Sequence, residues 1–81
     1  MRIDILLFGP QAELAGTDRI PLDLSESATV SDAITRLGQA VPTLASTLEV
    51  SRLAVNHDYA APTDTLSEGD EVALIGMVSG G

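Results

Sequence analysis

The feature that most limits the possible folds of this chain is one amphipathic helix, predicted over Thr29 to Val41, with strand-like segments on both sides. Thr29 can cap this helix, Asp32 three residues later gives a variant of the capping box, and Pro42 ends it. A single apolar stripe of this kind packs against one apolar face, which predicts a layer of helix on a layer of sheet. The stripe consists of Val30, Ala33, Ile34, Leu37 and Val41.

Segments rich in Ile, Leu and Val are predicted as strands before and after this helix. The first segment, Arg2 to Phe8, is apolar on both faces, which favours a central position in a sheet. In the second segment, Arg19 to Leu24, Pro21 favours an edge position. A short helix is predicted over Pro10 to Ala15, and Leu44 to Leu48 is compatible with one more helical turn. Strands are predicted at Arg2 to Phe8, Arg19 to Leu24, Arg52 to Asn56 and Glu71 to Ile75, and turns at Asn56 to Asp58 and Leu66 to Asp70, where Gly69 suits a positive φ.

Two strands before the helix and two after it predict an α+β fold, a mixed sheet of four to five strands with one main helix across one face. The first and last strands are the most apolar and should lie side by side in the middle. This arrangement is the β-grasp, or ubiquitin-like, architecture. The chain would then divide into one domain over residues 1–76 and an extended tail over 77–81.

The composition excludes several classes of site in this 81-residue chain. No cysteine is present, so disulfides, thiolate metal sites and a cysteine sulfur carrier are excluded. A single histidine, His57, cannot form a histidine-rich metal site, and no metal is expected. The absence of lysine means that no side-chain amine can form a Schiff base or accept an acyl group.

Acidic residues outnumber basic ones by twelve to four, which gives a formal net charge of −8. Nucleic acids and anionic membranes repel such a surface, so neither is an expected partner. A basic protein surface fits instead, although solubility or adaptation to salt would explain the acidity equally well. Asp4 interrupts the N-terminal apolar run and no long apolar segment follows, so a cytoplasmic protein without a targeting segment is expected.

The other polar motifs are weak candidates for chemistry. Gly9-Pro10 lacks the further glycines and the lysine of a phosphate loop. Glu68, Asp70 and Glu71 are expected to be a solvated turn, with partner docking a better alternative than acid–base catalysis. His57, beside Asp58, is expected to be a surface histidine.

The last residues, Ser79-Gly80-Gly81, are the strongest candidate for a functional site. A Gly-Gly end has no Cβ atoms and can thread a channel that admits only backbone, while Met77 and Val78 could give it an apolar anchor. A terminal carboxylate is ionised at neutral pH and can attack the phosphate of ATP. The resulting acyl-adenylate can be captured by sulfide, a thiolate or an amine. The alternative is a frayed end without chemistry.

Three segments of the chain carry a resemblance to a known family: FGPQAELAGTD (Phe8 to Asp18), LAVNHDY (Leu53 to Tyr59) and LSEGDEVALIGMVSGG (Leu66 to Gly81). Together they resemble the small subunit of molybdopterin synthase, a family of sulfur carriers. The departures are Ala12, where the family often has arginine, and Gly76-Met77, where it usually has Pro-Pro.

The resemblance implies a sulfur carrier without independent catalytic activity and without a bound cofactor. An ATP-dependent activating enzyme would adenylate the carboxylate of Gly81, which would become a thiocarboxylate. The tail would then enter the large synthase subunit and pass sulfur to cyclic pyranopterin monophosphate, which becomes the dithiolene of molybdopterin. A heterotetramer of two small and two large subunits is also implied.

Three alternatives remain open at this stage. The chain could serve another pathway as a thiamine-type sulfur carrier, or be a ubiquitin-like modifier that forms an isopeptide bond through Gly81, or be an interaction module whose tail does no chemistry. The candidate partner-binding residues are Phe8 and the tail residues Met77, Val78, Ser79 and Gly80, but for Phe8 packing in the core is the favoured interpretation.

Overall fold

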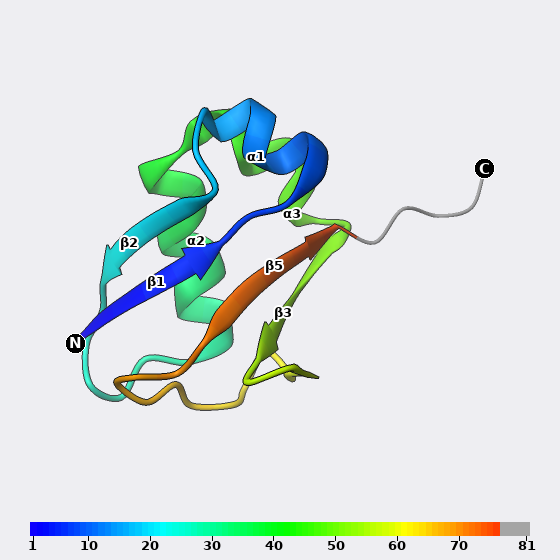
Figure 1. The fold of residues 1–81 in the computed structure, drawn as a ribbon. Helices are drawn as coiled ribbons and strands as arrows, with labels where there is room; N and C mark the ends of the chain where they lie inside the picture. The colour runs from blue at the N-terminus through cyan, green and yellow to red at the C-terminus, as the bar shows by residue number, and fades with distance from the viewer. Residues whose placement is uncertain (77–81) are drawn as a thin grey trace.

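A five-stranded mixed sheet and a helix across one of its faces form the two layers of the molecule (Figure 1). The computed structural model describes residues 1–76, and the predicted tail lies outside the described residues. The strand order in the sheet is β2-β1-β5-β3-β4. The strands are β1 (Arg2–Leu6), β2 (Arg19–Asp23), β3 (Ser51–Val55), β4 (Asp58–Tyr59) and β5 (Val72–Gly76), and the helices are α1 (Gly9–Ala15), α2 (Val30–Ala40), the 3-10 helix η1 (Pro42–Leu44) and α3 (Ala45–Leu48).

The first and last strands lie side by side at the centre of the sheet, as their apolar sequences predict. β1 and β5 run parallel, with Ile5 opposite Val72, and each pairs on its other side with an antiparallel neighbour. Pro21 lies in β2 at the edge of the sheet, which confirms the position expected for a residue without a backbone N–H. The predicted β-grasp arrangement is therefore confirmed.

The fifth strand, β4, forms within a hairpin where only a turn was predicted. Asn56 and His57 have φ values of 52° and 75°, which allow a two-residue reversal between β3 and β4. Asp58 consequently pairs with Val55 as the first residue of β4, so its assignment to the turn was wrong. The sequence of β4 is too short to show a strand pattern, which is why the hairpin partner was missed.

The main helix begins where the capping residues predict. Thr29 Oγ1 accepts a hydrogen bond of 3.2 Å from the backbone N–H of Asp32, and Asp32 Oδ2 accepts one of 2.9 Å from the backbone N–H of Thr29. The helix ends at Ala40, one residue earlier than expected, and η1 and α3 supply the additional helical turn. The reciprocal cap satisfies two N–H groups that would otherwise lack partners at the helix start.

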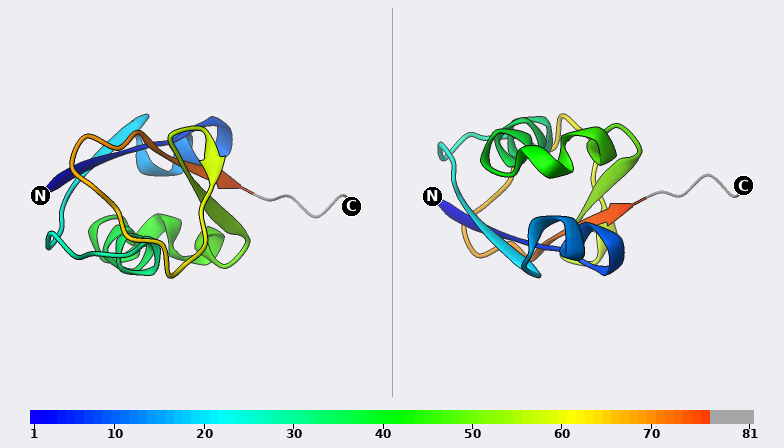
Figure 2. Two further views of the ribbon diagram at one scale, coloured as in Figure 1. Left: turned by 90° about the horizontal axis from the view of Figure 1, so that it is seen from below. Right: turned by 90° about the horizontal axis from the view of Figure 1, so that it is seen from above.

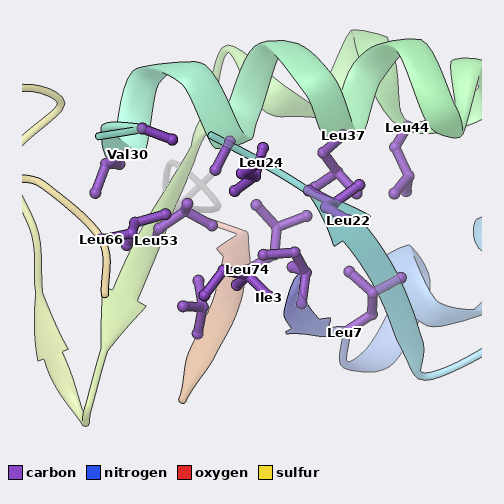
Figure 3. Packing of buried hydrophobic residues seen from close by; sticks show 14 residues of the cluster. Ile3, Leu7, Leu22, Leu24, Val30, Leu37, Leu44, Leu53, Leu66 and Leu74 are labelled. Carbon is purple, nitrogen blue, oxygen red and sulfur yellow. The ribbon is translucent and has the colours of Figure 1, made fainter. Parts of the chain in front are cut away.

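The core between α2 and the sheet is entirely aliphatic (Figure 3). Alternate residues of β1 point into it, and Leu66 reaches it from the loop that precedes β5. The views along the sheet show α2 on one side of β1 and β5 (Figure 2). The buried residues are Ile3, Ile5, Leu7, Leu22, Leu24, Ala28, Val30, Ala33, Leu37, Leu44, Leu53, Leu66, Val72 and Leu74.

The chain leaves the sheet earlier after β1 than the sequence predicts. β1 ends at Leu6, and α1 begins at Gly9 rather than at Pro10. Leu7 is still buried, but Phe8 is the N-cap of α1, where the strand alternation no longer decides which way a side chain points. The predicted strand through Phe8 was therefore two residues too long.

None of the helices formed by residues 1–76 has the length and apolar content that crossing a membrane requires. The longest of them, α2, has 11 residues.

We expect Leu37→Ala to lower the free energy of unfolding by about 2–5 kcal/mol, because it leaves a cavity under the centre of α2. Urea denaturation followed by circular dichroism would measure this loss. The matched control is Leu14→Ala, since Leu14 is 49% exposed and the same truncation should cost less than about 1 kcal/mol there. Equal losses at the two positions would contradict the packing described here.

Candidate functional site

The structure fixes the point from which the predicted site residues depart. Met77, Val78, Ser79, Gly80 and Gly81 lie outside the described residues. Gly76, the last residue of the central strand β5, pairs with Ser51 at the start of β3. Residues 77–81 follow, and such a segment can reach at most roughly 17 Å when fully extended. Any chemistry at the end of the sequence is therefore delivered from this corner of the sheet.

A buried polar cluster lies at the same corner. The side chain of Gln11, from α1, is only 7% exposed. Its Nε2 donates to Thr47 Oγ1 at 3.1 Å and to Ser51 Oγ at 2.8 Å. These hydroxyls donate in turn to the backbone oxygens of Leu44 and Thr47, each at 2.7 Å. The cluster ties α1 to α3 and to the start of β3.

The sequence alone does not indicate this cluster. Gln11 is 36 residues from Thr47 and 40 from Ser51 along the chain. No spacing within a single helix or strand records such a contact. One feature of the sequence could have indicated Gln11. It occupies a position of the short helix that faces the core, where an apolar residue is usual.

An open groove runs beside the end of β5, between α1 and the segment that leads into β3. Its apolar lining includes Phe8, Pro10, Val50 and Ile75, and Gly76 lies at its edge. Phe8 is 56% exposed, so the favoured interpretation of Phe8 as a core residue was wrong. Its exposed ring matches the alternative, a residue available to a partner.

A second exposed surface lies on the face of the sheet that α2 does not cover. Small and apolar side chains of three strands form its floor, and the hairpin between β3 and β4 forms one edge. On this edge the ring of Tyr59 packs under the guanidinium of Arg52, 5.5 Å from its Cζ. The lining residues are Leu6, Phe8, Ala54, His57, Tyr59, Glu71, Ala73 and Ile75.

His57 is a surface residue, as predicted, with 85% of its side chain exposed. Its Nε2 lies 3.1 Å from Glu71 Oε2, so the pair bridges the hairpin to the start of β5. At this exposure such a pair contributes little to stability.

The acidic turn before β5 is built from local hydrogen bonds. Asp70 Oδ2 accepts from the backbone N–H of Ser67 at 2.7 Å, and Asp70 Oδ1 accepts from Asn56 Nδ2 at 3.0 Å. Gly69 has a φ of 90°, which confirms the expected positive value. Glu68 and Glu71 are exposed, and residues 1–76 contain no group of three or more acidic or histidine side chains arranged to hold a metal ion. The turn is therefore a structural element facing solvent.

The five-stranded sheet, its single main helix and the corner that leads into the tail define a ubiquitin-like β-grasp protein. The model of the ThiS family matches residues 5–81. The chain therefore belongs to the ThiS family.

Curated relatives include two proteins named as molybdopterin synthase sulfur carrier subunits. The one from Dictyostelium discoideum is 41% identical over 80 residues, covering 95% of this chain and 93% of its own. The one from Chlamydomonas reinhardtii is 35% identical over 83 residues, covering all of both chains. The resemblance noted in the sequence is confirmed by these similarities.

A third relative is the small archaeal modifier protein 1 of Haloferax volcanii. It is 35% identical over 83 residues, with 93% of this chain and 95% of its own covered. A crystal structure of that protein superposes with a TM-score of 0.89 over 100% of both chains, at 32% identity. The same body is thus shared with a relative named as a modifier.

We expect Phe8→Ala to change the free energy of unfolding by less than about 1 kcal/mol, because the ring is largely exposed. The adjacent Leu7→Ala removes a side chain that is 1% exposed and should cost about 2–5 kcal/mol. Chemical denaturation of the two variants measures both values. A loss at Phe8 as large as that at Leu7 would contradict the exposed position of its ring.

Proposed function

We propose that this chain is the sulfur carrier subunit of a molybdopterin synthase. The observation that carries this proposal is the identity of 35–41% to two relatives of that name, over nearly the whole length of each chain. The family match extends to Gly81, the residue to which we assign the chemistry. The sequence contains no cysteine, so a sulfur atom carried by this chain needs another attachment point.

The activation step needs a partner with a nucleotide site. A carboxylate oxygen of Gly81 attacks the α-phosphate of ATP, pyrophosphate leaves, and an acyl-adenylate forms. A sulfur nucleophile at the oxidation level of sulfide then attacks the carbonyl carbon, and AMP leaves with the electron pair of the broken C–O bond. The product is a thiocarboxylate, in which sulfur has replaced one oxygen. ATP is thus used by the activating partner and not held by this chain.

The donation step takes place in the large synthase subunit. The thiocarboxylate sulfur attacks a side-chain carbon of cyclic pyranopterin monophosphate and forms a C–S bond. The C–O bond at that carbon breaks, its oxygen leaves with the electron pair and takes up a proton, and the chain is then joined to the pterin through a thioester. Water hydrolyses this thioester, which leaves the sulfur on the pterin and regenerates the carboxylate of Gly81. A dithiolene holds two sulfur atoms, so two such transfers complete one molecule of molybdopterin.

The folded body supplies the docking surface for these partners. The groove lined by Phe8, Val50 and Ile75 adjoins the point where the tail begins, so a partner that accepts the tail also covers this groove. Met77 and Val78 continue the apolar character along the sequence. The formal net charge of −8 favours partners with basic docking surfaces. We propose a cytoplasmic location as part of this function, because the activation step uses ATP.

The test is to append one alanine after Gly81. We expect the unmodified chain, purified from cells that contain the activating enzyme, to show a fraction about 16 Da heavier, because sulfur has replaced oxygen. The extended chain should lack this fraction and should fail to restore molybdopterin in a strain that depends on the carrier. Intact-mass spectrometry and a cofactor assay measure the two outcomes.

The control is the thermal unfolding of the extended chain, which should match that of the original because the added residue lies beyond the last strand, β5. Normal cofactor production by a folded chain whose extension is still attached would rule out chemistry at Gly81. A thiocarboxylate that supports thiazole formation but not molybdopterin would assign the chain to the thiamine-type pathway.

A protein modifier is the second candidate function, and the similarity to the Haloferax volcanii modifier favours it. In that case a lysine amine, instead of sulfide, would attack the same acyl-adenylate and form an isopeptide bond. We expect deletion of Gly80 and Gly81 to abolish any high-mass conjugates seen on immunoblots under denaturing, reducing conditions. Conjugates that persist after the deletion would exclude attachment through Gly81, and their absence from the original chain would exclude the modifier function under the conditions tested.

A further inference from the structure

Gln11 is the one buried polar residue among residues 1–76, in a domain whose core is otherwise aliphatic. Burial of an amide is unfavourable unless its polar atoms are hydrogen-bonded. Both N–H groups of the amide have partners, the hydroxyls of Thr47 and Ser51. Each of these hydroxyls also donates a hydrogen bond to a backbone oxygen, which fixes the position of the hydroxyl. The two fixed hydroxyls therefore set the orientation of the amide.

The fixed amide lies directly against the last residue of β5. A Cβ atom added to Gly76 would lie 3.3 Å from Gln11 Oε1 and 3.5 Å from Gln11 Cδ. The first of these distances is shorter than ordinary van der Waals contact. The amide of Gln11 therefore faces Gly76 across a gap slightly smaller than a side-chain methyl group needs, so any residue with a Cβ at position 76 would press on the amide.

Gly76 also lies at an end of the sheet where the strands can fray. Its pairing with Ser51 is the last pair between β3 and β5, and strand ends open at a low cost in free energy. Glycine adds the greatest backbone freedom of any residue. Gln11 thus lies against both residues of this last pair. Its Nε2 donates to the hydroxyl of Ser51, and its amide faces Gly76.

We propose that Gln11 is a positioning residue for the C-terminal segment. Hydrogen-bonded to Thr47 and Ser51 and packed on Gly76, it holds the end of β5 in place and so fixes the point and direction from which residues 77–81 depart. The inference rests on the proposed function, because it assigns Gln11 a part in sulfur donation by Gly81. Gln11 itself touches no reacting atom.

Gln11 would speed sulfur transfer by preorganisation, because it fixes the point from which the tail departs. The tail must reach an acceptor site inside a docked partner, and its reach from Gly76 is at most roughly 17 Å. A freely moving origin would spread the position of Gly81 over many directions and lower the fraction of docked complexes with reactive geometry. A fixed origin raises this fraction without adding any contact at the reaction centre.

The test uses Gln11→Leu, which keeps the size of the side chain and removes both hydrogen bonds, and Thr47→Val, which keeps the shape and removes one. Each variant is prepared as the thiocarboxylate and mixed with the large subunit and cyclic pyranopterin monophosphate. We expect the single-turnover rate of sulfur transfer at saturating large subunit to fall about tenfold for Gln11→Leu. The concentration of large subunit at half-saturation should change little, because the exposed docking surface is retained.

Backbone order at Gly76 provides a second measurement that does not depend on activity. We expect the amide order parameter of Gly76, from ¹⁵N relaxation, to fall from about 0.85 toward 0.6 in Gln11→Leu. The matched control is Thr29→Ala, which removes the cap of α2 and lowers stability elsewhere in the molecule. This control should change neither the order parameter nor the transfer rate, whereas a merely structural role of Gln11 would make the two variants alike.

A double-mutant cycle tests the contact between Gln11 and Gly76 itself. Gly76→Ala should lower the transfer rate in the original chain, because its Cβ displaces the amide. In the Gln11→Ala background the new methyl group meets no amide, so the same substitution should have little further effect. Additive effects of the two substitutions would overturn the proposed contact.

The outcomes separate this inference from the proposed function. An original thiocarboxylate chain that transfers no sulfur contradicts the proposed function, and the order parameter alone then decides whether Gln11 holds the end of β5. An active original chain, together with Gln11→Leu and Thr47→Val variants of unchanged rate and unchanged order parameter, contradicts the positioning role alone.

Discussion

The parallel pairing of β1 and β5 is the interaction on which the rest of the structure depends. It joins residues near the two ends of the described chain, with Ile5 opposite Val72, and places both strands at the centre of the sheet. Parallel strands require a crossover between them, and here the crossover contains every other element. Its main helix, α2, covers the apolar face that the two central strands expose. The remaining strands extend this centre on either side with antiparallel partners.

The same pairing determines where the described body of residues 1–76 ends, which is the point from which the proposed function would deliver Gly81 to a partner. β5 pairs with β1 through Val72 and Ala73 and with β3 along its whole length, and Val72 and Leu74 are buried in the core beneath it. The chain continues from Gly76, which is the end of this strand and pairs with Ser51 of β3. Beside that point lie the groove containing Phe8 and Val50 and the buried amide of Gln11. The body thus combines a firm origin for the tail with an apolar surface on which a partner can rest.

In the proposed mechanism, one acyl-adenylate chemistry would serve both functions considered for this chain. Sulfide that attacks the activated carboxylate gives a sulfur carrier, and an amine that attacks it gives a modifier. The choice is made by the nucleophile that the partner presents, and the body needs no difference for it. Relatives named for the two functions share about a third of their sequence with this chain, and the solved modifier also shares its fold, as a common activation step would predict.

The sequence by itself determined the features that depend on local pattern: the helix with its Thr29 cap, the central place of the first and last strands, and the edge position of Pro21. Each follows from periodicity, capping or the missing N–H of proline, which neighbouring residues record. Only the tertiary structure decided that Phe8 is exposed at the cap of α1 and that Gln11 meets Ser51. These outcomes depend on how α1 is placed against β3, which is set by the packing of elements some 40 residues apart along the chain, and no local pattern encodes it.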